Sequence, residues 1–273
     1  MKKIHIPTIP VRSDPHCPEV CGTLEAIIEG HFDIVWDIAF SPDGKLLAAS
    51  IDETVRIWSL ATRNTLRILE PNNMVVAVAF SPDGNLLAGA VIDEARAYGW
   101  ETIKLWDPAT GKEVQTEHDM DQTEHDMDSH NYTHFIAFSP DGKLLASSTK
   151  DMLRLWDPAT GFCLRTLPHS SHDRTIAFSP DGKLLASTGA GGVVKVWDPH
   201  TGHEMGRVAH SNYTSSIVFS PDGQLLISAS FGCTIQIWDP ATGITKQKTL
   251  AGKGDGLMST ALSPCGKMLA TKS

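Results

Sequence analysis

A five-residue motif, Phe-Ser-Pro-Asp-Gly, recurs along the chain and constrains the fold more than any other feature. Intact copies begin at Phe40, Phe80, Phe138, Phe178 and Phe219, and an altered sixth copy begins at Leu262. Successive copies lie 40, 58, 40, 41 and 43 residues apart. A period of about 40 residues indicates one supersecondary unit used several times, because a single unit of this size cannot bury its own apolar face.

A tryptophan follows each of the first five copies, and in four units it is followed by Asp-Pro. The five residues are Trp58, Trp106, Trp156, Trp197 and Trp238. The second unit is longer than the others because residues 92–101 lengthen one turn and residues 115–128 lengthen another. The repeated unit therefore carries two fixed motifs joined by segments of variable length.

Each unit is predicted to form four short strands. In the first unit, residues 34–40 and 45–50 flank the Ser-Pro-Asp-Gly turn, where Pro presets φ and Gly accepts positive φ. Residues 54–58 alternate with period two, and a more polar strand follows at 65–69. Four antiparallel strands repeated about every 40 residues predict an all-β fold of the propeller class.

The two motifs resemble those of WD40 repeats, and the resemblance covers residues 22–273. It divides the chain into an N-terminal segment, 1–21, which is a possible closing strand, and a WD40 β-propeller, 22–273. The near-verbatim copies also resemble the repeat arrays of fungal and bacterial NACHT-type or kinase-linked signalling proteins. The family likeness implies a protein-interaction scaffold.

The blade count depends on how the two ends of the chain meet. Six copies of the first hairpin are present, but the sixth unit stops at Ser273, where its third strand should begin. Residues 3–9 and 23–29 would supply the two missing strands and close a six-bladed ring, which removes exposed sheet edges. Pro7 and Pro10 disfavour a regular strand at the first of these positions. The alternative is that the chain is a fragment of a larger protein.

Composition limits the partners and the compartment. With 23 Lys and Arg against 32 Asp and Glu, the formal charge is −9, which disfavours nucleic acid. No apolar run is long enough to cross a membrane, and Pro7 and Pro10 interrupt any leader. Five scattered cysteines fit reduced thiols. We therefore expect a cytoplasmic protein with protein or peptide partners and no cofactor or metal.

In the WD40 family, a buried network of His, Ser or Thr, Asp and Trp ties the strands of a blade together. By motif offset the third unit carries the complete set: His130, Ser147, Asp151 and Trp156. The first unit has His31, Asp52 and Trp58, with Ala48 assigned to the serine position. The fourth unit has His169, Ser187 and Trp197, with Gly191 in place of Asp, and the fifth has His210, Ser228 and Trp238, with Gly232. Because the spacing recurs in each unit, a structural network is predicted rather than a catalytic triad.

The resemblance also implies a contact surface at the mouth of the central channel. The family's contact positions lie four and six residues before the motif phenylalanine and in the turn after the second strand. They correspond here to Ile34, Trp36, Met74, Val76, Tyr132, His134, Lys150, His172, Arg174, Tyr213, Ser215, Phe231, Gly256 and Met258. Aromatic residues, Met and Arg are favoured in interface cores, so this set predicts partner binding.

Other features admit two interpretations each. Residues 115–128 contain six carboxylates and two histidines in a tandem duplication, which suits either a metal or docking loop or a tolerated surface insertion. His16, Cys17 and Cys21 have no second ligand pair at a zinc-site spacing, so a free-thiol segment is expected. Two functional alternatives remain: a small-molecule or enzymatic propeller using His134 and His172, and a degenerate remnant of a larger receptor that binds nothing specific.

Overall fold

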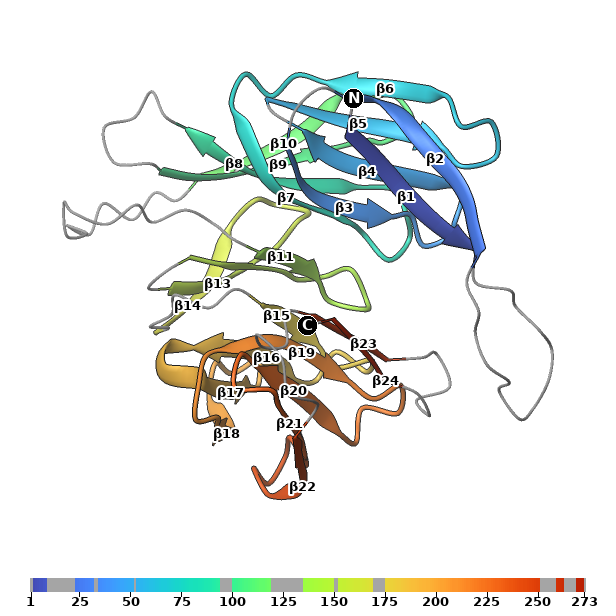
Figure 1. The fold of residues 1–273 in the computed structure, drawn as a ribbon. Coiled ribbons are helices and arrows are strands. Elements are labelled where there is room, and N and C mark those ends of the chain that lie inside the picture. The colour runs from blue at the N-terminus through green and yellow to red at the C-terminus, as the bar shows by residue number, and fades with distance from the viewer. Residues whose placement is uncertain are drawn as a thin grey trace.

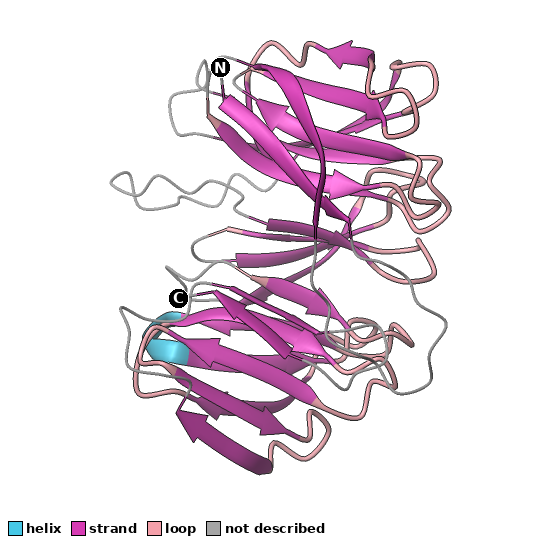
Figure 2. Ribbon diagram, turned by 45° about the vertical axis from the view of Figure 1, so that its right-hand side comes forward, coloured by secondary structure: helices cyan, strands magenta, loops and turns pink. Residues whose placement is uncertain are grey.

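The computed structural model describes residues 2–8, 23–31, 34–51, 53–93, 100–118, 135–149, 152–168, 175–250, 259–262 and 269–272. Within these ranges the chain forms β-strands joined by turns and loops, together with one short 3₁₀ helix, η1 (Ala190–Gly192) (Figure 2). The strands form five sheets of four strands and two sheets of two strands. The predicted all-β class is therefore confirmed for the described residues.

The five large sheets are antiparallel meanders whose strands follow one another in chain order (Figure 1). Sheet 1 contains β3 (Val35–Phe40), β4 (Leu46–Ile51), β5 (Thr54–Ser59) and β6 (Thr65–Leu69). Sheet 2 contains β7 (Met74–Phe80), β8 (Leu87–Asp93), β9 (Trp100–Trp106) and β10 (Glu113–His118). Sheet 3 contains β11 (Phe135–Phe138), β12 (Leu145–Ser148), β13 (Met152–Trp156) and β14 (Cys163–Pro168). Sheet 4 contains β15 (Ile176–Phe178), β16 (Leu185–Gly189), β17 (Val193–Trp197) and β18 (Glu204–Ala209). Sheet 5 contains β19 (Thr214–Phe219), β20 (Leu226–Ser230), β21 (Thr234–Trp238) and β22 (Thr245–Leu250).

The Ser-Pro-Asp-Gly turn has the same geometry in every large sheet. In sheet 1, Ser41 Oγ donates to Asp43 Oδ1 at 2.7 Å and accepts the N–H of Leu46 at 2.8 Å. Gly44 has φ of 67°, a conformation that costs little only for glycine. Hydrogen bonds from the Ser41 hydroxyl and then from the side chain and backbone of Lys45 lower the pKa of Asp43 to about 2. The turn therefore fixes the register of the first hairpin from local sequence alone.

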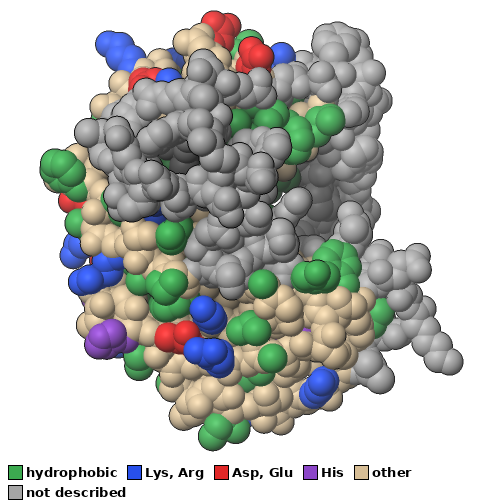
Figure 3. Space-filling view, turned by 90° about the vertical axis from the view of Figure 1, so that its left-hand side faces the viewer, with side chains coloured by type: hydrophobic (Ala, Val, Ile, Leu, Met, Phe, Trp, Pro, Cys, Tyr) green, Lys and Arg blue, Asp and Glu red, His purple; other side chains and the backbone are tan. Residues whose placement is uncertain are grey.

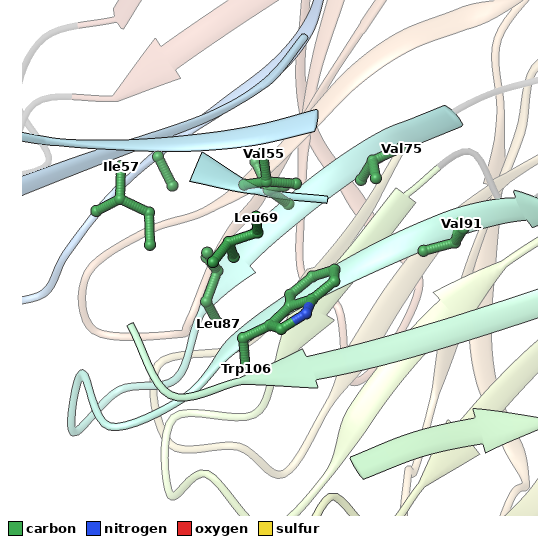
Figure 4. Packing of buried hydrophobic residues seen from close by; sticks show 9 residues of the cluster. Val55, Ile57, Leu69, Val75, Leu87, Val91 and Trp106 are labelled. Carbon is green, nitrogen blue, oxygen red and sulfur yellow. The ribbon is translucent and has the colours of Figure 1, made fainter. Parts of the chain in front are cut away.

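The core lies between neighbouring sheets. Trp106 of sheet 2 packs against Val55, Ile57 and Leu69 of sheet 1 (Figure 4). Trp156, Trp197 and Trp238 each pack in the same way against residues of the preceding sheet. Because each tryptophan fills the space between two sheets, a single repeat has no complete core, and stability depends on stacking.

Sheet 1 differs from the others in one face of its first strand. Ile38 is 45% exposed and Phe40 is 50% exposed. The residues that occupy the position of Ile38 in the other four sheets are 4–9% exposed: Val78, Ile136, Ile176 and Ile217. Each of these four is covered by the sheet that precedes it in the chain. The face of β3 that carries Ile38 and Phe40 is therefore open.

The two small sheets come from the ends of the chain. β1 (Lys2–Thr8) pairs with β2 (Thr23–His31), and β23 (Ser259–Leu262) pairs with β24 (Leu269–Lys272). Strands thus lie near both N-terminal positions at which the sequence predicts them. In the described residues, however, these two sheets do not pair with each other. The blade count and the closure of the ring remain predictions.

The hairpin β23–β24 packs against sheet 5 (Figure 1). Leu262 and Leu269 lie against Ile227, Ala229 and Ile235. A side-chain contact joins the first strands of the two sheets, because Ser216 Oγ accepts the N–H of Thr260 at 3.2 Å. The hairpin therefore stacks on sheet 5 as one large sheet stacks on the next.

Candidate functional site

Three first strands carry a β-bulge near their beginning. The register shifts between Val35 and Asp37 in β3, between Val75 and Ala77 in β7, and between Thr214 and Ser216 in β19. The extra residues are Trp36, Val76 and Ser215, each four residues before its motif phenylalanine. A bulge re-aims a side chain and stops regular pairing, and bulges are frequent next to functional sites. The sequence resemblance implied contact positions at these same three residues.

Four of the predicted contact residues have large exposed side chains. The exposed fractions are 46% for Ile34, 47% for Trp36, 48% for Tyr213 and 40% for Phe231. Met74, Val76 and Ser215 are half-buried. The other predicted positions lie outside the described residues: Tyr132, His134, Lys150, His172, Arg174, Gly256 and Met258.

The exposed residues lie at the end of the molecule where the first strands begin, and Figure 3 looks onto this end, which we call the strand-start end. In Figure 1 the arrows of β3 and β11 point to the right, so both strands begin on the left. Phe231 follows the second strand of sheet 5, and its N–H donates to the carbonyl of Tyr213 at 2.9 Å. The turn after the second strand therefore joins the same surface.

The opposite end carries the five Ser-Pro-Asp-Gly turns together with the turns between third and fourth strands, and neighbouring Ser-Pro-Asp-Gly turns lie close together. A Cβ on Gly84 would lie 3.6 Å from Cδ of Pro42 in the preceding sheet. The corresponding contacts are Gly142 with Pro82, Gly182 with Pro140 and Gly223 with Pro180. These turns form a continuous row and are nearly identical, whereas the described residues of the strand-start end differ between sheets 1, 2 and 5, as Trp36, Val76 and Ser215 do.

Two of the predicted networks contain a direct bond between tryptophan and serine. Trp156 Nε1 donates to Ser147 Oγ at 2.9 Å, and Trp197 Nε1 donates to Ser187 Oγ at the same distance. All four side chains are buried. The remaining members assigned to these units, His130, Asp151 and His169, lie outside the described residues.

Sheet 5 brings together His210 and Ser228, which the sequence assigns to one network, and it adds two hydroxyl residues, Thr234 and Ser230, that the sequence reasoning missed. His210 Nε2 lies 2.7 Å from Ser228 Oγ, and His210 Nδ1 lies 3.0 Å from Thr234 Oγ1. Thr234 also contacts Ser230 Oγ at 2.7 Å. Thr234 therefore takes the partner role that Gly232 cannot fill. The available signal was a hydroxyl residue four positions before Trp238, where sheet 4 has Val193.

Trp238 differs from its counterparts in sheets 3 and 4. Its Nε1 is buried and has no hydrogen-bond partner among the residues that the structure describes. The Oγ of Ser228, which stands at the position of Ser147 and Ser187, contacts His210 instead. In this sheet both ring nitrogens of the histidine have hydrogen-bond partners, whereas the indole N–H has none. A buried donor without a partner costs free energy.

One residue assignment from the sequence is wrong by one position. Ala49, not Ala48, occupies the serine position in sheet 1, because Ala49 pairs with Arg56 just as Ser147 pairs with Arg154. Ala48 instead faces sheet 2 with Val78. Trp58 packs with Leu47, Ala49 and Ile51. The motif offset gives the same answer for the serine position, since Ala49 lies nine residues after Phe40, as Ser147 lies nine residues after Phe138. Of the other residues assigned to this unit, His31 ends β2 and Asp52 lies outside the described residues.

Burial of His210 makes stability depend on pH. The side chain is 5% exposed, and desolvation, together with the charge of Lys248, lowers its pKa from 6.5 to about 4. The unfolded chain then binds more protons than the folded chain between these values, so stability falls as pH falls. We expect the free energy of unfolding to drop by about 2 to 3 kcal/mol between pH 7.5 and 4.5 from this group.

Urea unfolding of the wild type and of His210→Gln at both pH values measures this contribution. The variant should lose less stability than the wild type on acidification, because it lacks the buried imidazole while all other titrating groups are the same in both proteins. Equal losses in the two proteins would show that His210 does not titrate with a lowered pKa.

Two further properties bear on function. Within the described ranges, no group of three His, Cys, Asp or Glu side chains lies close enough to hold a metal ion. No helix in that part of the chain has the length and apolarity needed to cross a membrane. Of the duplicated acidic segment, residues 115–118 end β10 and the remainder lies outside the described residues.

Comparison with known proteins gives one family match. The family model described as "WD domain, G-beta repeat" matches residues 22–59, 63–107, 122–157, 161–198 and 202–239. Each matched segment ends one residue after the tryptophan of a large sheet. The segment 63–107 begins with the outer strand of sheet 1, β6, and continues through three strands of sheet 2. One sequence repeat thus spans parts of two sheets.

Similar curated proteins share shorter stretches with the chain. "Nuclear distribution protein PAC1" from Arthroderma benhamiae is 30% identical over 148 residues, which cover 51% of this chain and 30% of that protein. "Striatin-4" from Mus musculus is 45% identical over 58 residues, covering 20% and 8%. "Ribosome biogenesis protein BOP1 homolog" from Drosophila virilis is 35% identical over 69 residues, covering 24% and 9%. The matches span less than a third of each relative's length.

Proposed function

The chain belongs to the WD40 repeat family, and from this premise we propose that it is a non-catalytic scaffold that binds protein or peptide partners through its strand-start end. WD40 repeat proteins generally act as protein-interaction scaffolds. We place this one in a signalling or sensing assembly. The narrower likeness to NACHT-type or kinase-linked arrays remains a prediction from the repeat sequences.

The observation that carries this proposal is the bulge in β3, β7 and β19. In each strand the extra residue lies at a position that the family resemblance implies for contacts: Trp36, Val76 and Ser215. The bulge costs a ladder hydrogen bond, and it gives the side chain a direction that a regular strand would not allow. Exposed aromatic residues at such positions supply most of the affinity in protein interfaces.

The contrast between the two ends of the molecule supports the same surface. Nearly identical Ser-Pro-Asp-Gly turns recur at one end, and each turn uses its polar groups internally: Ser179 donates to Asp181, and Ser220 donates to Asp222. The strand-start end carries Trp36, Val76 and Tyr213 in different sheets. Discrimination between partners requires side chains that differ from one blade to the next, and this end has them.

We further propose that the ring closes with six blades and that β1–β2 and β23–β24 form the sixth. The first family match, 22–59, begins with β2, which thereby takes the place that β6 has in the match 63–107. Ala270 of β24 stands at the motif position that Ala88 and Ala146 hold in sheets 2 and 3. Ala88 packs in one cluster with Ile136 of the following sheet, and Ala146 packs in one cluster with Ile176 of the following sheet. In the proposed closed ring, the residues that correspond to these isoleucines are Ile38 and its neighbour Phe40, on the open face of β3.

Affinity capture with a tagged protein tests the scaffold function. We expect the double variant Trp36→Ala, Tyr213→Ala to retain specific host proteins at least tenfold less than the wild type, because it loses two exposed aromatic anchors. The double variant Phe162→Ala, Ile244→Ala is the control, since these residues are 70% and 64% exposed and follow the Trp-Asp-Pro turns. Retention of the same proteins by all three forms would contradict the proposed surface.

A further inference from the structure

A buried histidine joins the elements at the strand-start end of sheet 5. His210 is 5% exposed, and its ring nitrogens contact Ser228 Oγ of β20 at 2.7 Å and Thr234 Oγ1 of β21 at 3.0 Å. Thr234 Oγ1 also contacts Ser230 Oγ at 2.7 Å. We call these four side chains the His210 network. Because side chains alternate along a strand, Ser228 and Thr234 lie on the face of sheet 5 that carries Trp238 and packs against sheet 4.

The backbone around the His210 network is held at several points. The carbonyl of Gly192 in η1 accepts the N–H of His210 at 2.9 Å and the hydroxyl of Thr214 at 3.1 Å. The turn after β20 is bonded to the loop that follows His210, because the N–H of Phe231 donates to the carbonyl of Tyr213 at 2.9 Å. The imidazole therefore lies where this loop and this turn meet, and its position affects both.

Among the described residues, no unpaired carboxylate is available to balance a positive charge on the imidazole. Residues 210–217 and 228–235 contain no Asp, Glu, Lys or Arg. Glu204, the one carboxylate on β17, β18, β21 and β22, already pairs with Arg207 and Lys195. The titratable residues on the elements packed around the network are Lys195 of β17, Glu204 and Arg207 of β18, Tyr213, Cys233, and Lys246 and Lys248 of β22. Burial, and then the charge of Lys248, lower the pKa of His210 to about 4.

Ser228 has a second possible partner, which the neighbouring sheets identify. In sheets 3 and 4 the serine at this position accepts the indole N–H of the sheet's tryptophan at 2.9 Å. In sheet 5 the serine contacts His210 instead, and the buried Nε1 of Trp238 has no partner in the described part of the chain. A rotation of the Ser228 side chain would exchange one arrangement for the other, and the hydrogen bond gained would offset part of the one lost.

We propose that the His210 network is a pH-sensitive switch: the neutral imidazole holds the loop up to Tyr213 and the turn at Phe231 in place, and protonation of His210 releases both while Ser228 turns to the indole of Trp238. A neutral imidazole has one donor and one acceptor nitrogen, whereas the imidazolium has two donors and no acceptor. A buried cation without a counter-charge is unstable, so the protonated ring moves to water and its backbone moves with it. The switch goes beyond the scaffold function and does not depend on it.

Native-state hydrogen exchange of the full chain at pH 7 and pH 5 tests the switch, with rates converted to protection factors to remove the intrinsic effect of pH. We expect the protection factor of the Phe231 amide to fall about twentyfold, as follows from a pKa of about 4 in the closed network and 6.5 in the released loop. His210→Gln has no group that titrates here and should abolish the fall. Low urea concentrations should not change the fall in the wild type, because a local opening exposes little surface.

Gly232→Asp and Gly232→Asn form a matched pair of variants at the same network. A Cβ on Gly232 would lie 3.6 Å from Ser230 Oγ, so both side chains would begin beside the network, but only aspartate supplies an anion. An anion there balances the imidazolium. The fall in Phe231 protection should therefore be smaller in Gly232→Asp than in Gly232→Asn.

The exchange of partners by Ser228 has a separate readout. In His210→Leu the serine has no histidine partner, so the indole N–H resonance of Trp238, assigned by comparison with Trp238→Phe, should lie downfield of its wild-type position at pH 7. An unchanged resonance would reject the turn of Ser228.

The switch itself would be overturned by a Phe231 protection factor that is the same at pH 7 and pH 5, or by equal falls in the wild type and His210→Gln. A fall that depends on urea as strongly as global unfolding does would also overturn it, because no local release would then exist.

Discussion

Replacement of Trp156 by alanine is expected to lower the free energy of unfolding by about 3 to 5 kcal/mol, among the largest effects of any single substitution in the chain. The indole is fully buried between sheets 2 and 3, where it packs with Ile103 and Leu105. Its removal opens a cavity at the contact between two sheets and leaves Ser147 Oγ without the donor that it now has at 2.9 Å. Urea unfolding monitored by circular dichroism measures the loss.

A pair of milder substitutions separates packing from hydrogen bonding. Trp156→Phe and Trp238→Phe remove similar volume, but only Trp156 donates to a serine in the described residues. Trp156→Phe should therefore cost about 1 to 2 kcal/mol more than Trp238→Phe, because the latter also removes a buried donor that has no partner. Equal costs would show that the indole hydrogen bond contributes nothing to stability.

Replacement of Ile38 by alanine is expected to lower the free energy of unfolding by about 2 to 4 kcal/mol, as much as Ile176→Ala. The expectation follows from the proposed sixth blade, which covers the open face of β3. Without such a cover a side chain that is 45% exposed contributes little, and the substitution should change stability by less than about 0.5 kcal/mol. Unfolding in urea distinguishes the two cases.

Ile176→Ala is the matched control, because Ile176 holds the same motif position in sheet 4 and is 9% exposed. A loss for Ile176→Ala with none for Ile38→Ala would reject the closed ring. Replacing Ala270 by Asp gives an independent check, since this residue of β24 is predicted to meet Ile38 and Phe40. The closed ring requires that substitution to destabilise the protein as well.

The strands were predictable because their signals are local. Alternation in residues 34–40 and 54–58 and the turn chemistry at 41–44 predict β3, β5 and the hairpin between them, and the structure has β3 at Val35–Phe40 and β5 at Thr54–Ser59. The repeat carries the same prediction to the other sheets, whose register follows the turn. Exposure at Ile34, Trp36, Tyr213 and Phe231 agrees with a surface role, although partner binding there stays a proposal.

The sequence could not predict features that depend on contacts between distant residues. Thr234 meets His210 across 24 residues of chain. A hydroxyl residue four positions before the tryptophan does not mark a histidine partner by itself, because Thr54 and Thr102 hold the same position in sheets 1 and 2. The unpartnered Nε1 of Trp238 follows from the orientation of Ser228 toward His210, which only the folded sheet specifies. The assignment of Ala48 to the serine position is a different case, because the motif offset alone already places Ala49 there, as the strand pairing does.

By itself, the sequence determined the repeat, the four-stranded unit and the turn that sets its register, because turn chemistry and period-two alternation act over a few residues. Only the tertiary structure decided which sheets bury their faces and which face stays open. That outcome depends on how sheets stack across 40 or more residues. Trp106 packs against Val55 of the preceding large sheet, whereas Ile38 is 45% exposed. Packing between sheets is a property of the assembled chain, and a single repeat does not contain it.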